Sequence, residues 1–216
     1  LTMFTQGKIK ELKSIQILTQ NTKMKKTSKE NKIRLFNFGI TAYKSYSTGK
    51  ITCPFAKDCV KYCYAKKGAY VWRNVKASYE MRYLLTKQPE LFIEKMSTAI
   101  LDRKATHIRI HDSGDFYNYE YIKAWFKIIN KFPKVKFYAY TKSKKLFDVV
   151  AGLVPKNLQL IYSLGSKFDN LIDQENDRHS KLFNSEEELI SAGYVNASNN
   201  DLLAITKNKK VGLLKH

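Results

Sequence analysis

Residues 106–163 read THIRIHDSGDFYNYEYIKAWFKIINKFPKVKFYAYTKSKKLFDVVAGLVPKNLQLIYS. Short apolar runs predict three strands, at residues 106–111, 135–140 and 158–163. The intervening segments, 115–131 and 143–153, carry apolar side chains at helical spacing. Strands that are separated by single helices pair in parallel through right-handed crossovers. This stretch therefore predicts an α/β fold.

The flanking sequence predicts further elements of the same domain. Before the central stretch we predict a strand at 33–40, a long helix or helix pair at 63–87, and a helix at 89–102. After it we predict an irregular loop at 165–184, a helix at 185–192, and strands at 202–206 and 211–214. Residues 1–32 are polar and Lys-rich, and predict a basic N-terminal arm with a short helix and a basic loop. We find no linker or internal repeat, so residues 33–216 form one domain.

The charge of the chain is high and uneven. The 216 residues carry a formal net charge of +20, and residues 1–150 hold 31 Lys and Arg against 11 Asp and Glu. Such a charge attracts polyanions, and nucleic acid is the partner to expect first. Lys greatly outnumbers Arg, which favours contact with the phosphate backbone over reading of bases. The alternative is a Lys-rich surface that serves only solubility.

Composition also limits where the protein acts. No apolar run approaches the roughly 18 to 20 residues that a membrane helix needs, so we expect no membrane partner. The first 13 residues lack the apolar core of a secretory signal. Three cysteines are too few for a disulfide framework. We therefore expect a cytoplasmic protein in a reducing compartment.

All three cysteines lie close together in TCPFAKDCVKYCYA, residues 52–65. Cys53, Cys59 and Cys63 have the spacing C-x5-C-x3-C, and thiolates gathered in one loop suit a soft metal. The alternative is three free structural cysteines. Structural zinc needs a fourth ligand, which would have to be a histidine from elsewhere in the chain. A [4Fe–4S] cluster on three cysteines leaves one iron open for a non-protein ligand, which is similar to the arrangement in enzymes that bind S-adenosylmethionine. This cluster is the first expectation and zinc the second.

A second set of polar residues surrounds the end of the first central strand. Strand alternation puts Arg109 and His111 on one face, toward a barrel lumen, and both are candidate catalytic residues with Asp115. Ser113 and Gly114 would let a ligand approach the backbone, and Asp115 could accept a hydrogen bond from a ligand ammonium group. The carboxyl ends of parallel strands usually carry the site. The alternatives are that Asp115 caps the next helix and that His111 is a hydrogen-bonded core residue.

A third set follows the next two strands. Tyr140 and Lys142 come at the end of the second central strand, and Ser163 at the end of the third. They would lie at the same rim as Asp115 and could bind ribose, carboxylate or phosphate. The alternative is that these polar groups only cap strand ends.

These blocks together resemble a phage family that is named after mycobacteriophage gene product eighty-eight. The resemblance runs from about residue 20 to residue 216, and residues 211–216 are similar to the family's ending, in which a histidine is the last residue of the domain. It is carried by residues 21–24, 52–54, 59, 63–65, 68, 70, 109–116, 137–143 and 211–216.

At greater distance the layout is similar to the radical S-adenosylmethionine superfamily. A three-cysteine loop follows the first strand, Tyr62 precedes the last cysteine, and a Ser-Gly-Asp turn stands where that superfamily has Gly-Gly-Glu-Pro. Both gaps between the cysteines are longer than in that superfamily. The likeness implies that the three cysteines hold the cluster, that Asp115 contacts the methionyl amine, and that the domain is a partial (β/α) barrel.

Three functions remain open at this level. The first is a radical-SAM-like enzyme that acts on nucleic acid or nucleotides. The second is a non-catalytic, metal-stabilised phage protein that binds nucleic acid or a host protein in the bacterial cytoplasm. The third is a nuclease that holds a divalent ion with Asp112, Asp115 and His111. The oligomeric state does not follow from the sequence.

Overall fold

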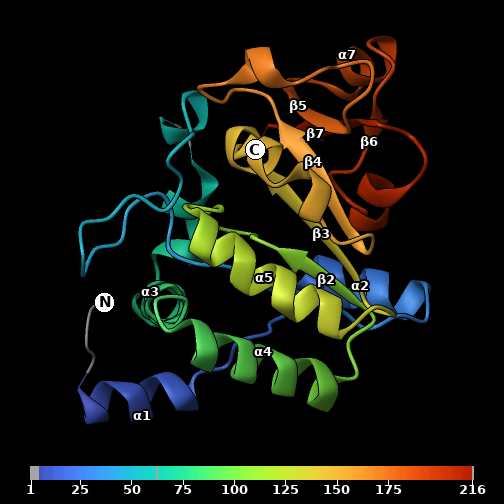
Figure 1. Cartoon of the computed structure of the whole chain (residues 1–216). Coiled ribbons are helices and arrows are strands. Elements are labelled where there is room, and N and C mark those ends of the chain that lie inside the picture. The colour runs from blue at the N-terminus through green and yellow to red at the C-terminus, as the bar shows by residue number, and fades with distance from the viewer. Residues whose placement is uncertain (1–4, 62, 216) are drawn as a thin grey trace.

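The computed structural model describes residues 5–61 and 63–215, and within them seven strands form one parallel sheet. The order across the sheet is β1-β2-β3-β4-β5-β7-β6, and the sheet curls into a half-barrel (Figure 1). This confirms the predicted α/β class and the partial barrel. The strands are β1 (Leu35–Phe38), β2 (His107–Ile110), β3 (Lys136–Thr141), β4 (Leu158–Ser163), β5 (His179–Phe183), β6 (Val195–Asn196) and β7 (Lys210–Leu214).

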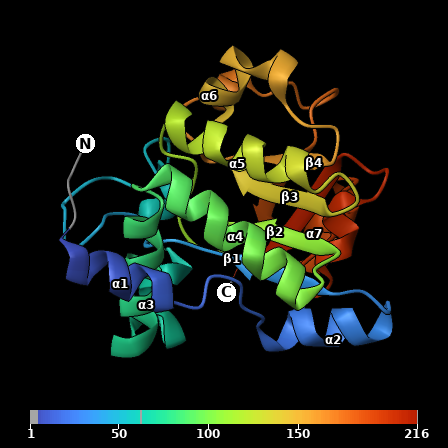
Figure 2. The same ribbon diagram turned by 60° about the horizontal axis from the view of Figure 1, so that its bottom comes forward.

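Helices cover the outer face of the first strands, and α4 and α5 lie side by side against β2 and β3 (Figures 1 and 2). In the described residues the α-helices are α1 (Gln6–Ser14), α2 (Thr22–Glu30), α3 (Arg73–Leu85), α4 (Pro89–Arg103), α5 (Tyr119–Lys131), α6 (Lys144–Val149) and α7 (Glu186–Ser191). None of these helices has the length and apolar character needed to cross a membrane.

The predicted alternation holds for residues 108–110 of β2, and β3 has the same pattern. Ile108 and Ile110 of β2 point into the main apolar core beneath the helices, together with Phe137 of β3. Tyr138 points to the opposite, inner face, where it packs in a second and smaller apolar cluster. One side of each strand therefore builds the core, and the other side faces the interior of the half-barrel.

The N-terminal segment packs into the domain. Leu12 of α1 lies in the main core and Met24 of α2 in the inner cluster, and both are fully buried. The lysines at 23–29 lie on a helix, where a loop was predicted, because the Asn21 side chain accepts a hydrogen bond from the Met24 amide and starts α2. Residues 22–30 therefore form a helix with a buried side at Met24 and Thr27, although the segment is rich in lysine.

Three predicted elements differ in the structure. Residues 165–184 are not wholly irregular, because β5 pairs there with β4 and β7. The strand predicted at 202–206 is a 3₁₀ turn, Asp201–Ile205, which the Asn200 side chain caps. The helix predicted at 63–87 begins only at Arg73, after short 3₁₀ turns at Tyr64–Lys66 and Gly68–Val71.

Candidate metal and ligand site

The loops that follow β1 to β4 meet at the carboxyl edge of the half-barrel. The cysteine loop, residues 52–63, is tied to two of them by backbone hydrogen bonds. The Asp115 amide donates to the Thr52 carbonyl over 3.1 Å, and the Lys167 amide donates to the Phe55 carbonyl over 2.9 Å. The Asp58 amide donates to the Gly165 carbonyl over 3.3 Å. The loop is thereby fixed over the ends of β2 and β4.

The three thiols lie close enough to affect one another. Cys53, Cys59 and Cys63 are free and partly buried. Burial is the main cause that raises the pKa of Cys53 well above its ordinary value, and Asp115 and the other two thiols raise it further. Burial also raises the pKa of Cys59, against the opposing effect of the Lys142 ammonium group. The three thiols, Asp115 and Lys142 therefore lie close enough for their charges to interact.

The donor set suits a soft metal in ligand type, because all three side chains are free thiols. In residues 5–61 and 63–215, no group of three or more His, Cys, Asp or Glu side chains is gathered as a metal ion requires. The sulfurs would have to move toward one another to hold a cluster. None of the three thiols is engaged in a disulfide.

Asp115 is buried at the end of β2, and both of its carboxylate oxygens accept hydrogen bonds. Its carboxylate accepts hydrogen bonds from the Thr141 hydroxyl at 2.6 Å, the Lys142 amide at 2.8 Å and the Phe116 amide at 2.7 Å. Burial raises its pKa, and these donors oppose the rise. Asp115 does not cap α5, because the Asn118 side chain does so. It joins the ends of β2 and β3 beside Cys53, and its contact with a ligand stays a prediction.

Lys142 and Ser163 lie at the same edge, as predicted. The Lys142 ammonium group donates to the carbonyls of Leu164, at 2.8 Å, and Ser163, at 3.4 Å. The Ser163 hydroxyl accepts from Ser180 of β5 at 3.0 Å. The structure therefore brings Asp115, Lys142 and Ser163 together with the cysteine loop.

The turn 111–114 packs closely against the chain that leaves β1. The Ile40 amide donates to the Ser113 carbonyl at 2.9 Å. Gly114 has a φ of +80°, and a Cβ at this position would overlap Ile40. Both features require glycine. Asp112 accepts a hydrogen bond from the Tyr79 hydroxyl at 2.6 Å, so this turn is also joined to α3.

His111 does not share a face with Arg109, contrary to the sequence prediction. Its φ of +67° breaks the strand alternation and turns the ring into the main core. There the His111 Nε2 atom lies 2.8 Å from the Tyr121 hydroxyl, and its ring contacts Phe116 edge to face. Burial lowers its pKa to about 3, so the imidazole is neutral at physiological pH. The structure thus has the alternative arrangement, a hydrogen-bonded core histidine.

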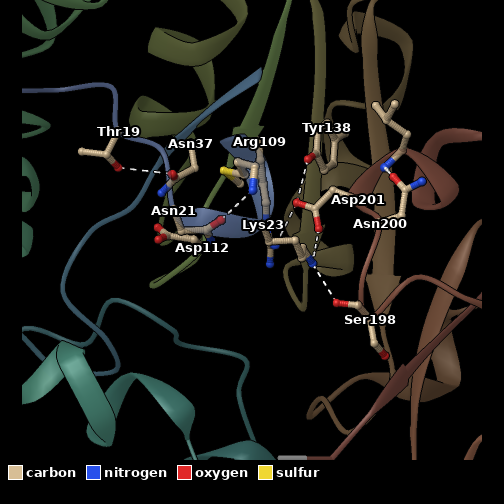
Figure 3. A network of polar contacts seen from close by, with 12 residues as sticks. Thr19, Asn21, Lys23, Asn37, Arg109, Asp112, Tyr138, Ser198, Asn200 and Asp201 are labelled. Atoms are coloured by element: carbon tan, nitrogen blue, oxygen red, sulfur yellow. Dashed lines mark hydrogen bonds and ion pairs between the residues drawn. The ribbon is translucent and has the colours of Figure 1, made fainter. Parts of the chain in front are cut away.

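Arg109 does point to the inner face, where its charge is paired. Its guanidinium group lies 3.1 Å from the Asp201 carboxylate, which also accepts a hydrogen bond from Tyr138 at 2.9 Å (Figure 3). Lys23 of α2 forms a second ion pair with Asp201. Burial opposes the ionisation of Asp201, but Arg109 and Lys23 more than offset it and lower its pKa. Tyr140 lies beside this network, with its ring 5.1 Å from the Arg109 guanidinium carbon.

This network connects the elements that surround the interior of the half-barrel. It joins β2 and β3 to α2 and to the 3₁₀ turn at 201–205, and the Lys23 ammonium group also donates to the Ser198 carbonyl at 3.0 Å (Figure 3). The sequence analysis assigned no role to Lys23 or Asp201. Arg109 and Tyr140 are therefore apart from the group formed by Asp115, Lys142 and Ser163.

Comparison with known proteins identifies the family. The profile of the family described as "Gene product 88" matches residues 15–216, which is most of the chain. The chain belongs to the gene product 88 family. A Gene 88 protein of Mycobacterium phage D29 is 31% identical over 123 residues, covering 52% of this chain and 51% of that protein. One of Mycobacterium phage L5 is 33% identical over 123 residues, covering 52% of each.

The chain spans about half the length of these gene 88 relatives. No solved structure matches it. The match to the gene product 88 family covers the three cysteines and the turn 111–114, which confirms the resemblance to this family. The link to the radical S-adenosylmethionine superfamily stays a prediction. Two residues used in the resemblances, Tyr62 and His216, lie outside the described residues.

Proposed function

We propose that this gene product 88 protein binds a [4Fe–4S] cluster through Cys53, Cys59 and Cys63 and acts as a radical-SAM-like enzyme on nucleic acid or nucleotides. The observation that carries the proposal is the backbone hydrogen bond from Asp115 to Thr52. It holds a loop with three free thiols at the carboxyl edge of a parallel half-barrel, where ligands of such folds bind. The basic surface would attract the polyanionic substrate.

The residues of the chain have separate tasks in this proposal. The three cysteines hold the cluster, and the cluster, when bound, supplies one-electron reduction of S-adenosylmethionine at its open iron. Asp115 would orient the ligand ammonium group, and Lys142 would balance the charge of the thiolates beside Cys59. Ser163 would border the same ligand, whereas Gly114 packs against Ile40 and Ser113 borders a neighbouring cleft, so these two residues would only shape the turn after β2. Arg109, Tyr140 and His111 would support this site without touching the ligand.

The first experiment is anaerobic reconstitution of the full chain with iron and sulfide, followed by absorption and EPR spectra with and without S-adenosylmethionine. We expect four irons per chain and a reduced signal that changes when the ligand is added. Replacing any one of the three cysteines by Ser should remove the signal. Lys61→Ala is the matched control, because Lys61 is an exposed neighbour in the same loop. A protein that retains full iron without the cysteines would contradict the proposal.

A second candidate is a non-catalytic protein that uses iron–sulfur or zinc to fix the cysteine loop and binds nucleic acid or a host protein in the host cytoplasm. One observation favours it, because Asp115 already accepts three hydrogen bonds from its own chain and so needs no ligand. Asp115→Asn separates the two functions. It should weaken S-adenosylmethionine binding in the enzyme, whereas in the second candidate it should change neither metal content nor nucleic-acid binding. Stoichiometric zinc and a colourless protein after reconstitution would favour the second candidate.

A further inference from the structure

A cleft of about 320 Å³ opens beside the cysteine loop and is not part of the group around Asp115. It lies between the chain that leaves β1, the two 3₁₀ turns after the cysteine loop, and α3. Ser113 of the turn after β2 also borders it. Its walls combine four tyrosines, Tyr43, Tyr46, Tyr70 and Tyr79, with three lysines, Lys44, Lys66 and Lys76.

Two of the tyrosines are fixed. The hydroxyls of Tyr70 and Tyr79 both donate to one oxygen of Asp112, and their ring centroids are 5.4 Å apart. Tyr46 is different, because it lines the cleft beside Lys76 and is 55% exposed. The cleft therefore combines two fixed rings, Tyr70 and Tyr79, with one exposed ring, Tyr46. A flat ligand can stack on the exposed ring.

Two of the cations lie over tyrosine rings of the cleft. The Lys66 ammonium group is 4.7 Å from the centroid of Tyr43, and that of Lys76 is 5.4 Å from the centroid of Tyr46. Lys66 also donates to the Val60 carbonyl at 3.1 Å, which leaves further donor hydrogens for a ligand. No acidic side chain lines the described part of the cleft. Two buried carboxylates lie behind the cleft walls: Asp112 accepts from Tyr70 and Tyr79, and one oxygen of Glu80 accepts from Ser45 and Ser47.

A ligand that combines a flat ring with a negative charge matches this surface. Its ring can stack on the tyrosines, and its charge can pair with the lysines. The cleft volume is at the lower end of the range for small-ligand sites, so it suits a single nucleotide unit and not a duplex. Val71 lines the cleft, the next residue in the chain is Trp72, and both are more than half exposed. This gives a place for a neighbouring base of the same strand.

We propose that this cleft binds single-stranded nucleic acid, with one base stacked on Tyr46 and the adjoining phosphates on Lys66 and Lys76. This inference deepens the nucleic-acid part of the proposed function and is independent of the cluster. A free nucleotide has the same chemistry, so competition by nucleoside monophosphate has to be compared with competition by a strand.

The test is fluorescence anisotropy of a labelled twelve-residue oligo-dT and of the same length of oligo-U, with the full chain prepared without added metal. Tyr46→Leu should weaken binding at least about fivefold, while Tyr46→Phe, which keeps the ring, should not. Lys76→Gln should reduce the slope of log affinity against log salt by about 0.7, because one phosphate contact is lost. The charge-matched control is Lys134→Gln, since Lys134 is exposed and precedes β3 at the opposite edge of the sheet.

The outcomes are distinct. Weaker binding by Tyr46→Leu and by Lys76→Gln, with little change in Lys134→Gln, supports the proposal. Equal effects of the two Lys substitutions and none of Tyr46→Leu would show a general charge effect and overturn it. Duplex binding as tight as strand binding, or no binding of either, would also overturn it. Competition by thymidine monophosphate as strong as by the strand would assign the cleft to free nucleotides instead. None of these readings depends on iron, so failure of the cluster proposal stays separate.

Discussion

Replacing Asp201 by Ala should destabilise the protein strongly, because this carboxylate is the centre of the inner-face network. Its side chain is 1% exposed, whereas those of Arg109 and Lys23 are 16% and 29% exposed. The substitution would leave two cations and the Tyr138 hydroxyl without their shared acceptor. Removal of one partner from a buried ion pair costs about 3 to 5 kcal/mol. We expect about 3 kcal/mol, since Lys23 can turn toward water and Arg109 keeps its contact with Tyr140.

The pH dependence gives this prediction a second readout. The folded-state pKa of Asp201 lies below its ordinary value, because Arg109 and Lys23 outweigh the effect of burial. Its stabilising effect is therefore fully present above the unfolded pKa of about 3.9, and is lost as the pH falls toward the folded pKa. The difference between wild type and Asp201→Ala should be constant from pH 7 to about pH 5 and should shrink below about pH 4.

Urea unfolding followed by circular dichroism measures both quantities. Asp102→Asn is the matched control, because Asp102 is exposed, and its effect should stay within about 0.5 kcal/mol. Lys23→Met tests the same network from α2 and should cost less than Asp201→Ala. A loss below about 1 kcal/mol at pH 7, or a difference between variants that grows on acidification, would refute the reasoning.

Two further substitutions and one pH titration test other parts of the structure. Leu12→Ala should lower the free energy of unfolding by about 2 to 5 kcal/mol in urea titrations, because Leu12 is fully buried in the main core; a loss near zero would contradict the packing of α1. Gly114→Ala should cost at least about 2 kcal/mol in thermal unfolding, owing to its positive φ and the overlap with Ile40, whereas Gly152→Ala, with open space around it, should be nearly neutral. His111, with a pKa lowered to about 3 by burial, should show no imidazole titration by NMR between pH 8 and pH 5; because the unfolded chain binds that proton near pH 6.5, stability should fall by about 1.4 kcal/mol per pH unit below that value. A titration of the folded state near pH 6.5 would disprove this burial.

The carboxyl edge of the sheet could be located from sequence, but its division into separate sites could not. Asp115, Lys142 and Ser163 follow successive strands, and parallel pairing brings their positions together. The Tyr and Lys residues of the cleft come from three segments of irregular structure. No periodic pattern relates such segments, so their common surface is visible only once the chain is folded.

The sequence by itself determined the α/β class, the three central strands, the outward and inward faces of residues 108–110 in the first of them, and the grouping of the cysteines. These features are local, because the alternation of apolar residues reports directly which face of a strand is buried. The tertiary structure decided the position of His111, where one left-handed residue reverses the face. It also decided the pairing of Asp201 with Arg109 and Lys23, residues that are 92 and 178 positions away in the chain. Such pairs form because packing brings them together in a space that excludes water, and that space does not exist until the sheet, α2 and the turn at 201–205 have assembled.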